Sequence, residues 1–267
     1  AGKRDGPMIK YDDTGNIIAR SEYKDGVLVE PEPKPEPPIP PATKAFPTAP
    51  ADWQWVMVSD ADQPHPLAAI GCATAKSCGE RGWLLFGGSD GTKTYDETWI
   101  FAGEEWSKID VAGGAHPTAC TDASLEFVPS RSVWILFGGK DEAGKALGQT
   151  WEFDGKQWKD LNLSSPNARW GAAMAYQSSL DRLVLYGGTT RYSPEFEDTW
   201  VFKVSEGSWE LLPAKGKGPG PRAFAALAEC SDNSCMLLYG GRGGFPLESA
   251  DAETWALAGG DWGQCKY

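Results

Sequence analysis

Histidine is scarce in this 267-residue chain, as are the motifs of several enzyme classes. Its two histidines, His65 and His116, are each followed by proline, and we interpret them as loop residues rather than metal ligands. No Gly-x-x-x-x-Gly-Lys-Ser/Thr segment is present to cradle a phosphate group. No apolar run reaches the roughly 18 residues of a membrane-spanning helix. These absences predict a protein that uses no cofactor and is not an enzyme.

Positive charge is also in short supply. Lysine and arginine number 25 against 37 acidic residues, which gives a net charge of −12 and an isoelectric point near 4.7. Because an acidic surface repels phosphate backbones, we exclude nucleic acid as a partner. We expect other protein subunits as partners instead, with a membrane-associated complex still open.

The six cysteines favour disulfides over a metal site, because no Cys-x-x-Cys spacing occurs. Two close pairs, Cys72 with Cys78 and Cys230 with Cys235, predict local disulfides in an extracytoplasmic compartment such as the periplasm, the outer surface or the medium. The alternative is buried free thiols in a cytosolic protein. Cys120 and Cys265 remain, and could pair with each other. The chain starts at Ala1 without Met, which leaves open a removed signal peptide or lipid anchor.

The composition divides the chain into three regions. Residues 1–30 carry Asp-Gly and Thr-Gly-Asn turns that predict small hairpins and resemble MORN-like, YwqK-type repeats. Nine of the residues in 31–50 are proline, which predicts an extended linker or a strap bound along a partner, with a flexible tether as the alternative. Residues 51–267 are repetitive and predict one domain.

Four repeats fill this third region. Each has an apolar run that ends in Gly-Gly, and the first glycines, Gly87, Gly138, Gly187 and Gly240, are 51, 49 and 53 residues apart. A polar loop, a Thr-Trp step and a second tryptophan follow each pair. The second tryptophans are Trp106, Trp158, Trp209 and Trp262. A period near 50 residues with paired glycines and aromatics is typical of propeller blades. Most of the 13 tryptophans are therefore structural, and not a sugar-stacking site.

The repeats resemble the kelch motif of its bacterial type, as in the central domain of galactose oxidase. Arg169 before a first strand, Leu183–Gly188 and the acid-Thr-Trp step at Asp198 form the best match. The resemblance implies an all-β, kelch-type β-propeller of four blades, each with four antiparallel strands, preceded by a Pro-rich arm. The second repeat departs from the pattern, with Cys120 in place of the arginine and Gln149 in place of the acid.

Closure of the propeller is a separate question, because kelch propellers usually have six or seven blades. Residues 53–58 resemble a surplus outer strand, since Trp55 precedes Trp106 by 51 residues. We favour four blades that close on themselves, and the alternative is a ring completed by another chain. The surplus strand is then either a relic of a fifth blade or a cover for an exposed strand edge.

The loops after each Gly-Gly are the expected contact surface, because loops on a rigid scaffold carry recognition. The function that we favour is a non-enzymatic scaffold or interaction module, an accessory subunit of an extracytoplasmic bacterial assembly. The alternatives are a carbohydrate-binding protein or kelch-type enzyme acting at the propeller face, and a surface structural subunit completed by neighbouring chains. The candidate binding residues are Lys93, Tyr95, Trp170, Arg191, Tyr192, Arg242 and Phe245, for which plain solvent exposure is the alternative.

Overall fold

The computed structural model is all-β, and the one helical segment among its described residues is the short 3-10 turn Ser178–Leu180. It describes residues 6–11, 17–24, 27–29, 69–71, 82–102, 105–111, 114–190, 195–213, 215–243 and 253–265. Two compact units divide the chain, residues 1–54 with residue 267, and residues 55–266. The described part of the chain has no helix that is long and apolar enough to cross a membrane.

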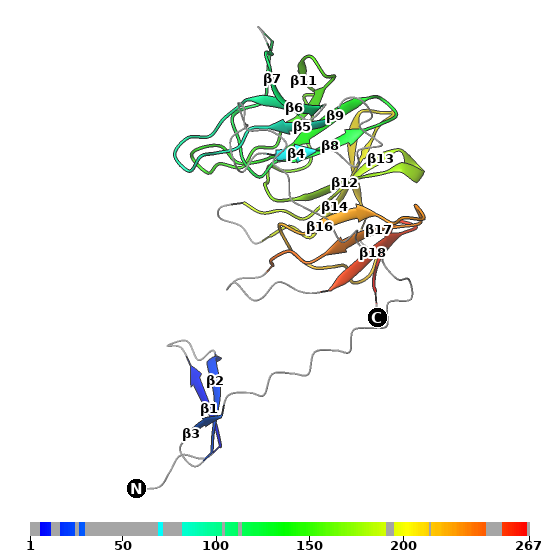
Figure 1. The fold of residues 1–267 in the computed structure, drawn as a ribbon. Coiled ribbons are helices and arrows are strands. Elements are labelled where there is room, and N and C mark those ends of the chain that lie inside the picture. The colour runs from blue at the N-terminus through cyan, green and yellow to red at the C-terminus, as the bar shows by residue number, and fades with distance from the viewer. Residues whose placement is uncertain are drawn as a thin grey trace, which may run out of the picture. The chain divides into compact units, whose positions relative to one another are not determined.

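The first unit contains a three-stranded antiparallel sheet (Figure 1). Its strands are β1 (Gly6–Tyr11), β2 (Ile17–Lys24) and β3 (Val27–Val29), joined in chain order. These strands lie in the segment for which small hairpins were expected, and the resemblance of that segment to MORN-like repeats stays a prediction. The Pro-rich segment 31–50 and the Trp53–Val58 strand lie outside the described residues.

The second unit consists of four sheets, each an antiparallel meander of four strands. We call these sheets blades 1 to 4. Blade 1 contains β4 (Ala69–Gly71), β5 (Trp83–Phe86), β6 (Thr98–Ala102) and β7 (Glu105–Ile109), and blade 2 contains β8 (Ser124–Val128), β9 (Val133–Phe137), β10 (Thr150–Phe153) and β11 (Trp158–Asp160). Blade 3 contains β12 (Ala173–Gln177), β13 (Arg182–Tyr186), β14 (Thr199–Lys203) and β15 (Ser208–Leu212). Blade 4 contains β16 (Ala226–Glu229), β17 (Met236–Tyr239), β18 (Thr254–Ala258) and β19 (Asp261–Gln264). Four blades of four strands match the expectation from the repeats.

The strand before each Gly-Gly is buried on both faces in the middle of the stack. All five residues of β9 are buried, as are the last four of β13. An isolated sheet could cover neither face, so this pattern requires a blade on each side.

The Gly-Gly pairs let one blade approach the next at backbone distance. The first glycines have φ values between +67° and +74°, which glycine adopts without strain. A Cβ atom on Gly138 would lie 2.4 Å from the Arg169 carbonyl oxygen in the following blade, and one on Gly187 would lie 2.1 Å from that of Arg222. The second glycine then donates to the same carbonyl, as Gly139 does to Arg169 and Gly188 does to Arg222, both at 2.9 Å.

The second tryptophans of repeats 2, 3 and 4, namely Trp158, Trp209 and Trp262, also join neighbouring blades. Each indole N–H donates to the threonine of the preceding Thr-Trp step, over 2.9 Å from Trp158 to Thr98 and 2.8 Å from Trp262 to Thr199. Each ring packs against the aromatic residue that precedes Gly-Gly in that same blade, as Trp262 does on Tyr186 with ring centroids 5.2 Å apart. We call this pairing of tryptophan with threonine and an aromatic ring the blade latch. It confirms that these tryptophans are structural.

An ion pair explains the arginine and the acid of the kelch-like pattern. The buried Arg169 guanidinium donates to both carboxylate oxygens of Asp198, at 2.5 and 3.0 Å, and to the Gly187 carbonyl at 2.9 Å. Asp198 also accepts the Trp200 indole N–H at 2.7 Å. Blade 2 has neither charge, because Cys120 occupies the position of the arginine and Gln149 that of the acid. An acid without the arginine would be a partly buried charge without a partner.

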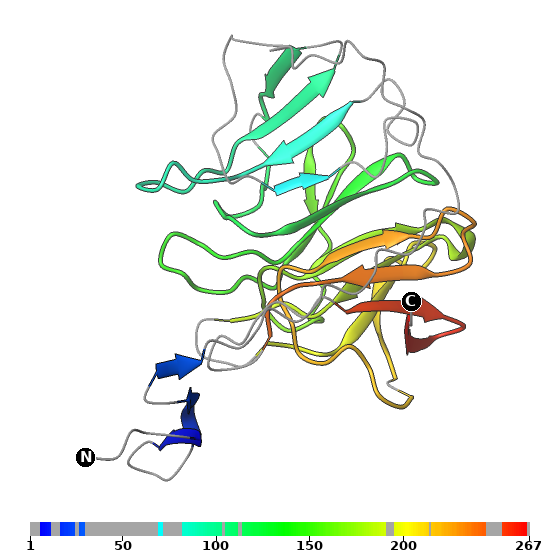
Figure 2. The same cartoon turned by 60° about the horizontal axis from the view of Figure 1, so that its bottom comes forward.

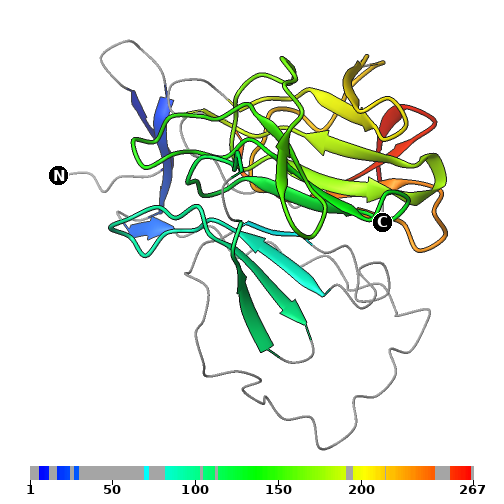
Figure 3. The same ribbon diagram turned by 90° about the horizontal axis from the view of Figure 1, so that it is seen from above.

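The blades follow one another in chain order, with blade 1 at one end and blade 4 at the other (Figures 1 and 2). Seen from above, the strands of blade 1 run at an angle to those of the later blades (Figure 3). The innermost strands β4, β8, β12 and β16 contact one another in that order. Among the described strands, no contact of similar extent joins β16 to β4.

The cysteines fall into three cases. Cys230 and Cys235 form the expected disulfide, in the turn between β16 and β17. Cys72 and Cys78 lie outside the described residues. Cys120 and Cys265 are both free, so the pairing considered for them is wrong. Cys120 occupies the buried position that Arg169 and Arg222 hold in blades 3 and 4, and burial raises the pKa of its thiol to about 12.

Candidate interaction surface

The loops after the first three Gly-Gly pairs are held by the backbone of the next blade. The backbone N–H of Cys120 donates to the Tyr95 carbonyl at 3.2 Å. In the same way, Arg169 donates to the Leu147 carbonyl at 3.0 Å and Arg222 to the Phe196 carbonyl at 3.1 Å. Each loop is therefore anchored near its middle to a residue just before an innermost strand. Side chains on such loops are displayed on a rigid base, which lowers the entropy lost when a partner binds.

A row of backbone hydrogen bonds runs across the same end of the blades. The Gly171 N–H donates to the Asp122 carbonyl at 2.9 Å, and the Phe224 N–H donates to the Gly171 carbonyl at 2.7 Å. All three residues have positive φ, between 57° and 63°. Gly171 must be glycine, because a Cβ there would lie 2.8 Å from the Phe224 ring. Phe224 is thereby held on the surface with 46% of its area exposed.

Two cations lie over aromatic rings at this end. Lys140 Nζ lies 5.7 Å from the Trp170 ring centroid and forms an ion pair with Asp122 at 2.7 Å. The Arg242 guanidinium lies 5.0 Å from the Phe224 ring centroid and makes no ion pair within the described residues. We call Asp122, Lys140, Trp170, Phe224 and Arg242 the mouth cluster. Exposed Arg over an exposed aromatic ring is a combination favoured at protein interfaces.

The blade 1 loop at this end is organised around Asp90. Its carboxylate accepts the backbone N–H groups of Thr92 and Lys93, each at 2.8 Å, and the Tyr95 hydroxyl at 2.6 Å. These hydrogen bonds, that of Tyr95 first, hold the pKa of Asp90 well below its usual range. The bond to Asp90 in turn raises the pKa of Tyr95. Lys93 is exposed, with its Nζ 5.0 Å from the Tyr95 ring centroid.

The predicted binding residues thus fall into three groups. Trp170 and Arg242 lie in the mouth cluster. Trp170 is largely buried, and Lys140 lies over its ring. Lys93 and Tyr95 lie together on the blade 1 loop. Arg191, Tyr192 and Phe245 lie outside the described residues.

Asp122, Lys140 and Phe224 were missed from the sequence. The available signal was their repeat position. Lys140 and Arg242 each directly follow a Gly-Gly pair, and Asp122 and Phe224 each stand two residues after Cys120 and Arg222.

One stretch has the Gly-x-Ser-x-Gly spacing of a nucleophile turn, namely residues 87–91. It lies in a loop between two strands, whereas a nucleophile turn joins a strand to a helix. The Ser89 hydroxyl accepts the Gly91 N–H at 3.1 Å, within the local turn. We therefore interpret this stretch as part of the Asp90 loop and not as a hydrolase site.

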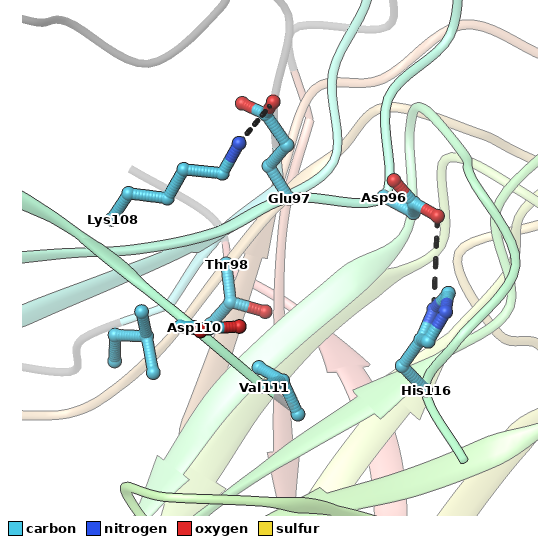
Figure 4. A pocket seen from close by; sticks show the side chains of 8 residues that line it. Asp96, Glu97, Thr98, Lys108, Asp110, Val111 and His116 are labelled. Carbon is cyan, nitrogen blue, oxygen red and sulfur yellow. Dashed lines mark hydrogen bonds and ion pairs between the residues drawn. The ribbon is translucent and has the colours of Figure 1, made fainter. Parts of the chain in front are cut away.

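A polar pocket of about 420 Å³ lies beside blade 1 (Figure 4). Lys108 pairs with Glu97 at 2.6 Å on one side of it, and His116 Nδ1 lies 3.8 Å from an Asp96 oxygen on the other. Asp110 also lines the pocket. The described residues contain no group of three or more His, Cys, Asp or Glu side chains placed to hold a metal ion. The lining suits a small polar ligand better than an apolar one.

A wider groove of about 690 Å³ lies at the opposite end of the sheets, between blades 2 and 3. Its lining includes Arg131, Lys159, Asp160, Asp181 and Glu206, which carry charges of both signs. This mixed lining lacks the aromatic anchors of the mouth cluster, which we therefore take as the stronger candidate for protein binding.

Comparisons with known proteins support the fold. No protein-family model matches the chain. An F-box/kelch-repeat protein of Arabidopsis thaliana is 27% identical over 183 residues, which cover 60% of this chain and 36% of that protein. The four sheets are the blades of a kelch-type β-propeller.

Two other relatives match the propeller at lower identity. An N-(sulfonatooxy)prop-2-enimidothioate sulfolyase of Thlaspi arvense is 24% identical over 171 residues, which cover 60% of this chain and 48% of the enzyme. The flagellar outer-arm dynein alpha chain of Chlamydomonas reinhardtii is 24% identical over 179 residues, covering 60% of this chain and 4% of the dynein. The chain spans less than half the length of each of these three relatives. Proteins with different names thus share similarity with this chain.

Proposed function

We propose that this chain is a non-enzymatic protein-interaction module that docks a partner protein through the mouth cluster. The observation that carries the proposal is the exposed Phe224–Arg242 pair, held by a backbone row that spans three blades. A rigid aromatic ring below a guanidinium that makes no ion pair with the described residues offers both an apolar anchor and a carboxylate-binding group. The partner surface that fits is an acidic segment with an apolar side chain at its centre.

The wider setting that we propose is an extracytoplasmic bacterial assembly, in which this chain is an accessory subunit. The Cys230–Cys235 disulfide supports an oxidising compartment. The MORN-like hairpins and the Pro-rich segment would engage a neighbouring subunit as an arm. Deletion of residues 1–50 should then weaken complex formation without unfolding the propeller, and an unchanged complex would remove the arm from this proposal.

The docking proposal is tested by affinity purification of the full chain from its native cells. Arg242→Glu combined with Phe224→Ala should reduce recovery of a stoichiometric partner about 10-fold or more, because both anchors are lost. Lys156→Glu is the matched control, since Lys156 is exposed in the turn between β10 and β11 at the opposite end of the blades. Equal loss of partner with both variants would contradict docking at the mouth cluster.

A second candidate function is suggested by the pocket in Figure 4, whose volume of about 420 Å³ suits a small molecule. Its two ion pairs and Asp110 favour a polar ligand such as a carbohydrate, which corresponds to the carbohydrate-binding or enzymatic alternative. A glycan array with Asp110→Ala as the negative control tests it, and binding by wild type but not by the variant would support this role.

A further inference from the structure

Blade 4 has an apolar face that no described residue covers. Its strands alternate between two faces, and Met236, Leu238, Trp255 and Leu257 pack against blade 3. The opposite face presents Tyr239, of which 54% is exposed. The other side chains on that face are exposed or half-buried, namely Ala226, Ala228, Leu237 and Ala256.

The repeat shows what this face is built to contact. Alignment on the Gly-Gly pairs matches these five residues with the five on blade 3 that pack against blade 4. The blade 3 residues are Ala173, Ala175, Val184, Tyr186 and Val201, all of them buried. The free face of blade 4 therefore has the composition of an internal blade interface.

Two further marks of a following blade are missing at this face. A Cβ on Gly187 would lie 2.1 Å from a carbonyl of the next blade, whereas one on Gly240 would have no atom of the described residues within 4 Å. Thr254 occupies the position of Thr98, Thr150 and Thr199, yet no indole N–H reaches it within the described residues.

Blade 1 carries the complementary half. Trp106 stands where the latch tryptophans Trp158, Trp209 and Trp262 stand, but its one ring contact within the described residues is with Phe101 of its own blade, at 5.2 Å. Trp83, at the position of the fully buried Trp134, Leu183 and Met236, is 39% exposed. Within the described residues, Thr254 and Tyr239 at the blade 4 end thus have no latch tryptophan. Among the same residues, Trp106 at the blade 1 end has no threonine and no aromatic ring of a preceding blade to contact.

We propose that a second copy of this chain seats its blade 1 on the free face of blade 4. Trp106 of that copy would donate to Thr254 and pack on Tyr239, which repeats the internal latch between chains. The contact is head-to-tail, so two copies of four blades either close a ring of eight (4 + 4) or extend further. This inference is independent of docking at the mouth cluster.

Sedimentation velocity of the full chain over a wide range of concentrations tests the self-association. Wild type should form dimers or larger species, and Tyr239→Glu and Trp83→Glu should each weaken the dimer about 10-fold or more. Leu211→Glu is the matched control, since Leu211 is exposed on the outer strand of blade 3 and belongs to neither free face. A circular dichroism melt of each variant confirms that it is folded.

Mixing the two weakened variants separates this arrangement from other dimers. Tyr239→Glu keeps an intact blade 1 end and Trp83→Glu keeps an intact blade 4 end, so the mixture should give a 1:1 heterodimer that grows no further. A wild-type chain that stays monomeric at every concentration would overturn the proposal, whatever else covers the face. A dimer that the substitutions do not weaken, or a mixture that does not associate, would overturn it equally.

Discussion

Glu126 on β8 offers a sharp test of how the blades pack, because it is a carboxyl group in a blade interface. Only 8% of the residue is exposed, and its Oε1 has no hydrogen-bond partner. Alignment of the repeats places Ala175 and Ala228 at the same position in blades 3 and 4. Burial raises the pKa of Glu126 from 4.5 to about 8. The folded protein therefore holds a proton at neutral pH that the unfolded chain has released.

The sign and size of the effect follow from that shift. Stability contributed by the protonated form is complete below pH 4.5 and is lost as the pH rises toward about 8. Each pH unit in this window changes the free energy of unfolding by about 1.4 kcal/mol, so going from pH 5 to pH 7 costs on the order of 3 kcal/mol. Glu126→Gln keeps the shape of the protonated side chain but cannot ionise, so it should remove this loss.

Urea unfolding followed by tryptophan fluorescence at pH 5 and pH 7 measures the effect. The free energy of unfolding of the variant minus that of wild type should be roughly 3 kcal/mol larger at pH 7 than at pH 5. Glu142→Gln, at an exposed loop position, is the control and should show no such change. A difference between wild type and Glu126→Gln that is the same at both pH values would refute the buried, protonated state.

Three further predictions concern the blade contacts. Gly187→Ala should destabilise the propeller by about 2 kcal/mol more than Gly240→Ala in chemical denaturation, because both have a φ of 67° but only Gly187 faces a carbonyl of the next blade. Trp209→Phe and Thr150→Val should each cost about 1 kcal/mol and couple in a double-mutant cycle, since they share a 3.0 Å hydrogen bond; additive effects would contradict the latch. Loss of the Cys230 disulfide by reduction should lower stability by roughly 2 kcal/mol, and an unchanged melting temperature would count against it.

The blade architecture could be predicted from the sequence because it repeats. Four Gly-Gly runs and four Thr-Trp steps place the same strand, the same close approach and the same latch in every blade. The Cys230–Cys235 disulfide could also be predicted from the sequence, since the six residues from Cys230 to Cys235 leave room only for a turn between two paired strands.

The interaction surface could be predicted only in part. Trp170 and Arg242 were proposed by residue type and stay predictions, and their neighbours depend on contacts between repeats. Phe224 is exposed because it stacks on Gly171 of the preceding blade, and Lys140 is held by Asp122. Such pairs have no fixed spacing in the sequence and emerge only when the blades are stacked.

Whether blade 4 meets blade 1 could not be predicted from the sequence either. The sequence contains four complete sets of strands, so closure depends on how far each blade turns relative to the last. That angle is set by side-chain packing between blades and is not encoded in any single motif.

The measurement that tests the central proposal most directly is lysine cross-linking with mass spectrometry on complexes gently purified from native cells. Docking at the mouth cluster predicts a stoichiometric partner cross-linked through Lys140 and Lys93, which lie at that end of the blades. A solitary protein, or a partner cross-linked only through Lys156 and Lys159 at the opposite end, would contradict it.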